Sequence, residues 1–251
     1  MSSRISTTEY GSRGLVGIGV PQANPTVEQE AFALRPPGLS IVTARLTSNA
    51  SDAAERLLEY FHGTPAYTAQ FDDLRIDAFG IACTGSSYLL GKQREAELIS
   101  EFSSQLGYPV ITAAMAIDAT LQALAARRIS IVSPYPDWLA DRSREFWSVA
   151  GYTVVEMRTV PLTGPNIHSI YALHSTDALQ QANQLHLDGV DAILFTGTGM
   201  PTLGAINPLH KRSGLPVLSS NLCLLSALAR QTGASAETLL AVPAELDTRA
   251  L

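Results

Sequence analysis

Short apolar segments rich in Val and Ile alternate with longer segments of helical periodicity along most of this 251-residue chain. Gly and Pro bound many of the apolar segments, which is typical of strands. The predicted strands cover residues 15–20, 39–46, 77–82, 109–112, 129–133, 152–157, 191–196 and 216–219. The predicted helices cover residues 51–62, 87–106, 115–127, 137–150, 173–188, 203–213 and 222–232, with a short helical tail in 235–251. Such alternation predicts βαβ crossovers and parallel sheets covered by helices on both faces.

The same series of segments occurs twice. DAFGIACTGSSYLLG at 77–91 matches DAILFTGTGMPTLG at 191–204, and VGIGVP ending at Pro21 matches ISIVSP ending at Pro134. The duplication predicts an α/β fold of two halves related by a pseudo-twofold axis, each a four-stranded parallel sheet flanked by helices. It favours this arrangement over a (β/α)8 barrel, which eight strands alone would also suit. The predicted halves are residues 1–113 plus 219–251, and residues 114–218.

The composition narrows the class of protein. With 46% hydrophobic and 16% charged residues the chain is expected to be globular, and its net charge of −6 argues against nucleic acid as a partner. A negative total does not exclude a small anionic ligand, because backbone amides bind anions locally. The N-terminus lacks the shape of a signal peptide and no apolar run is long enough for a membrane helix. We therefore expect a cytoplasmic protein with no membrane partner; its oligomeric state stays open.

The candidate site lies where the strands end. In parallel sheets, ligands bind beyond the carboxyl ends of the strands. Cys83 stands there, between the apolar FGIA and the helical pattern that follows. A thiol at a helix N-terminus is expected to have a lowered pKa, and Thr84, Gly85 and Ser86 would offer hydrogen-bond donors to an oxyanion. The alternative is an inert, buried cysteine at a strand end.

In the second copy of the repeat, Gly197 replaces the cysteine, followed by Thr198 and Gly199. This cleft would therefore carry a thiol on one wall only. Tyr135 also ends a strand and could donate to a carboxylate or enolate oxygen, although an ordinary surface or interface tyrosine is the alternative.

Other residues with chemical potential have simpler explanations. Asn24 and Asn166 lie beside prolines and suit turns or caps as well as ligand binding. Cys223 lies in an apolar helical segment and is expected to be a core thiol. Two cysteines and scattered histidines give no zinc spacing, so we assign no metal.

These motifs resemble the aspartate/glutamate racemase superfamily, in its branch of maleate isomerases and arylmalonate decarboxylases. VPQANPTVE at 20–28 is similar to the isomerase segment VPSSNTTxE, ACTGS at 82–86 resembles the first cysteine motif, and LSSNL at 218–222 resembles the start of the last large helix. The resemblance extends from about residue 14 to 232. It implies two α/β halves and cofactor-free chemistry next to a carboxylate of a small acid.

The resemblance also implies roles for single residues. Cys83 falls on the first of two cysteines that flank the substrate, Tyr135 on a carboxylate-binding tyrosine, and Asn24 and Asn166 on substrate-binding asparagines. The chain departs from the isomerases at Gly197, where they have the second cysteine. The arylmalonate decarboxylases resemble the mirror case, with Gly at the first position and Cys at the second.

One thiol limits the reaction. Racemisation in this family needs two proton-transfer groups on opposite faces of a carbon, whereas decarboxylation needs one donor. We therefore expect decarboxylation of a substituted malonate, with protonation from one face by Cys83. The alternatives are a maleate-type cis–trans isomerase or a racemase-like isomerase using Cys83 as nucleophile, and a catalytically silent carboxylate-binding protein on the same fold. A cysteine placed at position 197 is expected to add racemase activity.

Overall fold

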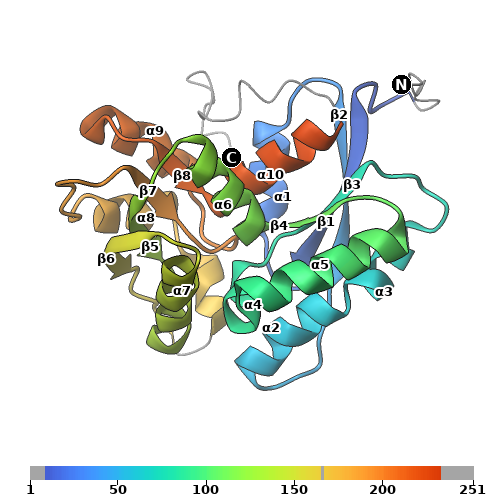
Figure 1. The fold of residues 1–251 in the computed structure, drawn as a ribbon, viewed down its shortest axis with the longest axis horizontal. Coiled ribbons are helices and arrows are strands. Elements are labelled where there is room, and N and C mark those ends of the chain that lie inside the picture. Colours follow the sequence, from blue (N-terminus) through green and yellow to red (C-terminus); the bar gives the residue numbers. More distant parts are fainter. Residues whose placement is uncertain (1–8, 165–166, 233–251) are drawn as a thin grey trace.

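The computed structural model describes residues 9–164 and 167–232, and in them two four-stranded parallel sheets lie side by side (Figure 1). The first sheet has the order β2-β1-β3-β4 and the second the order β6-β5-β7-β8. Their strands are β1 (Gly14–Pro21), β2 (Leu39–Leu46), β3 (Ala78–Ile81), β4 (Val110–Thr112), β5 (Arg128–Ser133), β6 (Thr153–Thr159), β7 (Ala192–Phe195) and β8 (Val217–Ser219). The identical order in the two sheets confirms the predicted fold of two matching α/β halves.

Helices cover these sheets. They are α1 (Thr26–Leu34), α2 (Ala53–His62), α3 (Thr64–Thr68), α4 (Thr84–Leu90), α5 (Lys92–Leu106), α6 (Ala113–Ala123), α7 (Asp137–Val149), α8 (Ser175–Ala182), α9 (Leu203–Ser213) and α10 (Ser220–Gln231), with the 3-10 helices η1 (Ala69–Phe71) and η2 (Ile167–Ala172). In Figure 1, α6 and α10 lie between the two sheets, while α2 to α5 lie on one side and α7 to α9 on the other.

The aspartate that opens each copy of the repeat has the same structural role in both halves. The Asp77 carboxylate accepts a hydrogen bond from the Leu15 N–H of the neighbouring strand at 2.8 Å. Likewise, the Asp191 carboxylate accepts from the N–H groups of Arg127 and Arg128 at 2.8 Å. These two backbone hydrogen bonds lower the pKa of Asp191. The repeated sequence therefore encodes a repeated strand alignment.

One of the two central strands in each sheet is fully buried. Every residue of β3 and of β7 is buried, as expected of parallel strands covered on both faces. An added Cβ at Gly80 in β3 would lie 2.8 Å from Leu228 Cδ1, so α10 packs directly on the first sheet. This contact is compatible with grouping residues from 219 onward with the first half. The domain boundaries themselves remain a prediction, and residues 233–251 lie outside the described part.

Three helical predictions differ from the structure. The segment 87–106 forms two helices, because Gly91, with a φ of +77°, interrupts it. Helix α1 was not predicted, although Val27, Ala31 and Leu34 are buried at helical spacing along it. The helix predicted over 173–188 covers only Ser175–Ala182. The tail predicted in 235–251 lies outside the described residues.

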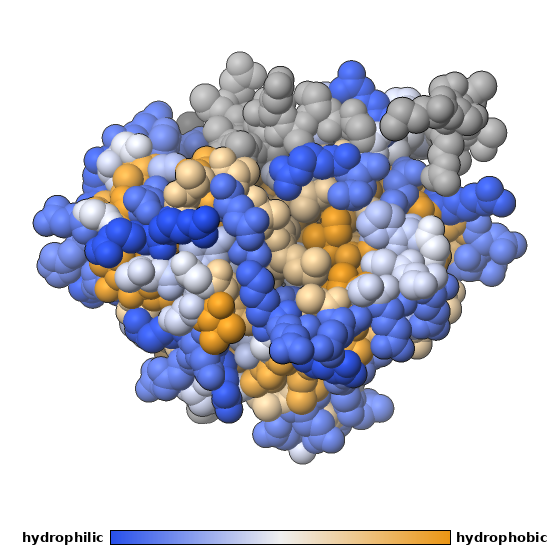
Figure 2. All heavy atoms as spheres, viewed as in Figure 1, coloured by the Kyte–Doolittle hydropathy of each residue, from blue (hydrophilic) through white to orange (hydrophobic). Residues whose placement is uncertain are grey.

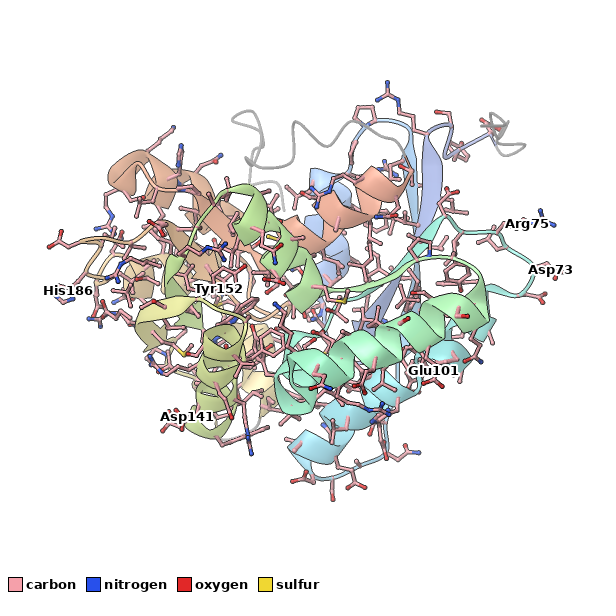
Figure 3. All side chains as sticks on the ribbon, viewed as in Figure 1. Asp73, Arg75, Glu101, Asp141, Tyr152 and His186 are labelled. Atoms are coloured by element: carbon pink, nitrogen blue, oxygen red, sulfur yellow. The ribbon has the colours of Figure 1, made fainter. Side chains whose placement is uncertain are left out.

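The surface is mostly polar. Hydrophilic residues cover much of the face in Figure 2, interrupted by small apolar patches. Side chains of both charges project from the periphery, as Figure 3 shows for Asp73, Arg75, Glu101, Asp141 and His186. Among the helices of the described residues, not one has the length and apolar character needed to cross a membrane.

Candidate functional site

A pocket lies between the two halves, at the edge where the strands end. The predicted residues that line it are Asn24, Cys83, Tyr135, Thr198 and Gly199. The other lining residues are Pro21, Ala53, Arg56, Leu57, Tyr60, Ile167, His168, Ile170 and Tyr171. The pocket therefore forms where the strand-end rule places it, with contributions from both halves.

Cys83 occupies the N-cap position of α4, directly after β3, and only 5% of its surface is exposed. Burial raises the pKa of this thiol, while hydrogen bonds from the Ser86 hydroxyl and the backbone N–H groups of Ser86 and Gly85 partly oppose the rise. The expected lowering of the pKa is thus wrong. Desolvation of the thiolate, the largest contribution, outweighs these few local donors.

The Ser86 hydroxyl has two acceptors within hydrogen-bond distance. Its oxygen lies 2.6 Å from the Leu57 carbonyl oxygen and 3.1 Å from Cys83 Sγ. A serine has a single hydroxyl hydrogen, and the carbonyl can only accept. That hydrogen is therefore shared between two acceptors, and the shorter contact with Leu57 limits how strongly Ser86 can donate to Cys83 Sγ. Ser86 contacts the thiol but is not one of the residues that line the pocket.

Thr84 connects the cysteine loop with the second half. Its Oγ1 lies 2.7 Å from the Tyr135 hydroxyl, and both groups are buried. Burial, followed by the nearby Cys83, raises the pKa of Tyr135 well above its usual value, so this phenol stays protonated and can donate. Tyr135 lines the pocket, whereas Thr84 and Gly85 lie behind its wall. A Cβ on Gly85 would lie 3.1 Å from Leu57 Cδ1, so this glycine lets α2 approach α4 closely.

Asn24 has both the turn role and a place in the pocket. Its Oδ1 accepts from the backbone N–H groups of Thr26 and Val27 at 2.9 and 3.3 Å, at the start of α1. Its Nδ2 donates to Thr198 Oγ1 at 3.3 Å, and that hydroxyl donates to the Ala82 carbonyl at 2.7 Å. The two halves are therefore joined by hydrogen bonds beside Cys83.

Gly197 cannot be exchanged simply for a cysteine. Its φ is +88°, and an added Cβ would lie 2.6 Å from Pro134 Cγ. A side chain there would meet both a strained backbone and a rigid ring. Gly197 itself is not among the pocket-lining residues, although Thr198 and Gly199 are. The expectation that a cysteine at 197 would simply add racemase activity is revised, because the loop must first move.

A buried carboxylate holds this second loop in place. Glu30 on α1 accepts from the backbone N–H groups of Thr202 and Leu203 at 2.5 and 3.2 Å, and from Asn221 Nδ2 at 2.8 Å. Asn221 Nδ2 also donates to the Thr198 carbonyl at 3.1 Å. Burial raises the pKa of Glu30, against these hydrogen bonds. The loop from Gly197 to Leu203 is thus ordered by residues far apart in the sequence.

The sequence analysis missed four polar pocket residues: Arg56, Tyr60, His168 and Tyr171. Arg56 and Tyr60 lie one helical turn apart on α2, on the face that also carries Ala53 and Leu57. That spacing was visible, but nothing in it showed which side of the helix faces a ligand. The candidate Asn166 lies outside the described residues.

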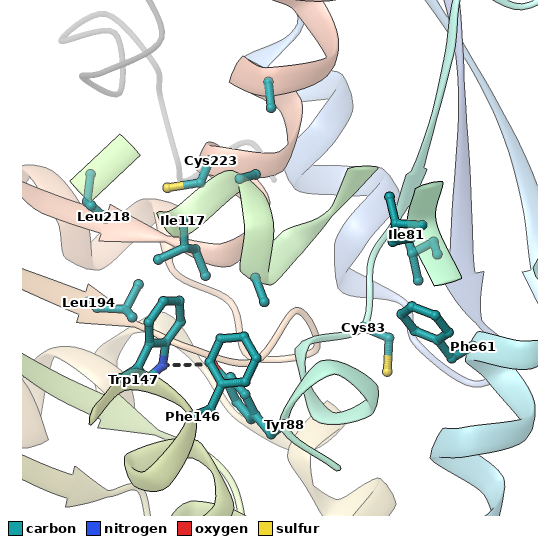
Figure 4. Close-up of a cluster of buried hydrophobic side chains, with 14 of the residues drawn as sticks. Phe61, Ile81, Cys83, Tyr88, Ile117, Phe146, Trp147, Leu194, Leu218 and Cys223 are labelled. Atoms are coloured by element: carbon teal, nitrogen blue, oxygen red, sulfur yellow. Dashed lines mark hydrogen bonds between the residues drawn. The ribbon is translucent and has the colours of Figure 1, made fainter. Parts of the chain in front are cut away.

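Cys223 lies away from this site. It is buried in α10, and burial raises its pKa to about 12. Figure 4 shows Cys223 beside Ile117 and Leu218, well apart from Cys83. Within residues 9–164 and 167–232, no group of three or more His, Cys, Asp or Glu residues is arranged to hold a metal ion.

A family model and a relative of known name each match most of this chain. A family model described as arylmalonate decarboxylase matches residues 16–240. A maleate isomerase of Geobacillus stearothermophilus is 25% identical over 218 residues, covering 82% of this chain and 86% of the relative.

Two solved structures share the fold. A cysteine-to-serine variant of a Nocardia farcinica maleate cis-trans isomerase, with a covalently bound succinylcysteine intermediate, has a TM-score of 0.77 at 23% identity, covering 88% of this chain and 93% of that one. An arylmalonate decarboxylase has a TM-score of 0.72 at 21% identity, covering 87% and 92%.

Proposed function

This chain belongs to the arylmalonate decarboxylase family, and from that premise we propose that it is a cofactor-independent enzyme that protonates a carbon next to a carboxylate. The reaction we favour is decarboxylation of a substituted malonate. One carboxylate leaves as CO2 and its bonding electrons remain as an enediolate. The Cys83 S–H then gives its proton to the carbon, and water restores the thiol.

The observation that carries this proposal is a buried thiol that lines the same pocket as a phenol hydroxyl. Burial keeps Cys83 as a thiol, which is the form that a general acid requires. The Tyr135 hydroxyl, held at 2.7 Å from Thr84 Oγ1, is a donor suited to the oxygen of an enediolate. Together these groups suit delivery of a proton and stabilisation of the charge that precedes it.

The missing second thiol supports proton delivery from one face. Gly197 stands at the repeat position equivalent to Cys83, and it offers neither an acid nor a base. A product formed by a single donor on one side of a planar enediolate is a single enantiomer. We therefore expect an optically pure acid from a substrate with a prochiral carbon.

A second candidate is cis–trans isomerisation of a maleate-like acid, with Cys83 adding to the double bond. Two observations favour it: the similarity to maleate isomerases, and a cation, Arg56, in the pocket wall that suits a second carboxylate. The same pocket would bind a small dicarboxylate without turnover if the protein were catalytically silent.

One experiment separates these candidates. The protein is incubated in D2O with substituted malonates and, separately, with maleate, and the products are followed by NMR. Decarboxylation gives CO2 and an acid with one deuterium at the α-carbon, whereas isomerisation gives fumarate without loss of carbon. Conversion of maleate with all malonates inert would overturn the decarboxylase proposal.

A silent binding protein gives neither product. Its test is the reaction of Cys83 with a small alkylating reagent, followed by mass spectrometry, with Cys223 in the same chain as the internal control. Protection of Cys83 by bound substrate with no turnover of any acid would favour the silent alternative.

A further inference from the structure

Arg56 brings a fixed positive charge to the pocket wall. Its Nε and Nη2 donate to the Ala50 carbonyl at 3.1 and 2.6 Å, and its Nη1 lies 3.0 Å from His168 Nε2. A guanidinium has five N–H groups and remains charged. Three of them are used in these contacts, so the side chain is oriented and two N–H groups are left for a ligand.

Among the described residues, no carboxylate forms an ion pair with Arg56. Of the acids on the same stretch of chain, Asp52 accepts from the Glu55 N–H at 2.8 Å and Glu59 accepts from the Ser48 hydroxyl, while the Glu55 side chain is exposed.

His168 adds no negative charge either. Because an arginine can only donate, His168 Nε2 must accept, which fixes the neutral tautomer with its proton on Nδ1. Its pKa is lowered by burial and by Arg56. The ring of His168 stacks on Tyr171 with centroids 5.7 Å apart, so it is held in place on the second half.

The polar residues of the pocket are therefore of two kinds, neutral and cationic. Around Cys83, the polar groups are neutral: the Tyr135 hydroxyl and the Asn24 and Thr198 pair. On α2, Arg56 is cationic and lies beside the apolar side chains of Leu57 and Ala53. Tyr60, one turn further along α2, also lines the pocket; burial, followed by the nearby Cys83, raises its pKa to about 12, while Arg56 opposes the rise.

We propose that Arg56 selects a substrate whose substituent, beyond the reacting carbon, carries its own anionic group. This inference rests on the proposed function and names its substrate class: a malonate with an acidic side chain, in place of an aryl or alkyl one. Arg56 does not bind the carboxylate that leaves. An ion pair with that group would stabilise the substrate and be lost as neutral CO2 departs, which would slow the reaction.

The test compares two malonates that differ in one group. Carboxymethylmalonate carries an anionic side chain, and carbamoylmethylmalonate is its neutral amide of nearly the same shape. For the wild-type protein we expect kcat/KM to be about 10- to 100-fold higher for the acid, since a charge-assisted hydrogen bond is lost with the amide. In Arg56→Gln the preference should fall to about threefold or less.

Two further variants keep the result interpretable. Arg56→Lys retains the positive charge but lacks the planar guanidinium with its paired N–H groups, and it should keep part of the preference for the acid over the amide. Arg94→Gln removes a cation that is paired with Glu97 on exposed α5 and should leave the preference unchanged. A wild-type preference for the amide or for phenylmalonate, or an acid preference that survives in Arg56→Gln, would overturn the inference.

A binding measurement separates this inference from the proposed reaction. Succinate and its monoamide, succinamate, are compared as protectants of Cys83 against alkylation. Stronger protection by succinate, lost in Arg56→Gln, supports an anion site even if every malonate is inert, which would count only against the decarboxylase. Equal protection by both acids refutes the anion site whatever reaction is found.

Discussion

The two halves of the molecule end their central strands in different ways. In the first half, β3 leads through Ala82 into Cys83, which is extended, with a φ of −147°, and caps α4 at once. In the second half, β7 ends at Phe195, Gly197 has a φ of +88°, and α9 begins only at Leu203. The first loop is a tight turn from strand to helix, whereas the second is a longer loop whose Thr198 and Gly199 line the pocket.

The absence of a cysteine at position 197 is therefore matched by a backbone conformation of the loop that disfavours any side chain there. In the second half, the loop is held by Glu30, Asn221 and Thr26, whose hydroxyl donates to the Gly199 carbonyl at 2.8 Å. These contacts fix a backbone in which position 197 cannot carry a side chain without strain. The duplication has therefore diverged into one half that carries a thiol at this position and one that carries a glycine in a constrained loop.

The largest expected effect comes from the thiol of the first half. Cys83→Ala should lower kcat by about 10⁴-fold, because the general acid is removed. Cys223→Ala, the matched control in the core, should keep nearly full turnover, since that thiol lies apart from the pocket. Steady-state rates with purified variants of comparable far-UV circular dichroism test this pair. Similar losses in both variants would show that Cys83 is not the acid.

The second prediction addresses the loop of the other half. Gly197→Ala should destabilise the fold by about 3 kcal/mol, from a positive φ and a clash with Pro134. Gly214→Ala is the control for backbone conformation alone, because its φ is +70° and an added Cβ meets nothing within 4 Å. It should cost about 1 kcal/mol. Urea unfolding measures the loss of unfolding free energy in both variants. Equal losses would show that the contact with Pro134 adds nothing to the cost of the positive φ.

The third prediction concerns the donor that the second half provides. Tyr135→Phe should lower kcat by about 10²-fold, because one oxyanion donor is lost from a buried site. Tyr152→Phe is the control: its hydroxyl donates to Asp118 at 2.6 Å, outside the pocket. Rates for the two variants decide the matter, and an unchanged rate in Tyr135→Phe would exclude this phenol from the chemistry.

The smallest expected effect is in the pH profile, and its sign distinguishes the two roles of Cys83. Its pKa is raised, so the protonated form persists through neutral pH. For an acid, kcat/KM should be flat from about pH 6 to about pH 8 and decline only as pH rises through the raised pKa. For a nucleophile, the rate should instead climb about tenfold per pH unit over that range. A climbing profile that Cys83→Ala abolishes would favour the isomerase.

Much of the site was predictable because its signals are local. The repeat showed that the strands end together, and Cys83 and Tyr135 stand directly at such ends. Arg56 and His168 could not be identified in this way. One lies on a helix and the other on η2, and their 3.0 Å contact depends on how the two halves pack together.

The sequence by itself determined the duplicated α/β architecture and the difference between the two repeat positions, because periodicity, punctuating glycines and residue identity are written locally along the chain. Only the tertiary structure decided that Cys83 is a buried thiol with a raised pKa, because desolvation depends on what packs around a group. It also decided that Gly197 has no room for a side chain, since Pro134, far away in the chain, occupies that space. The local sequence determines where the strands end, and packing between the two halves determines the chemistry of the residues at those ends.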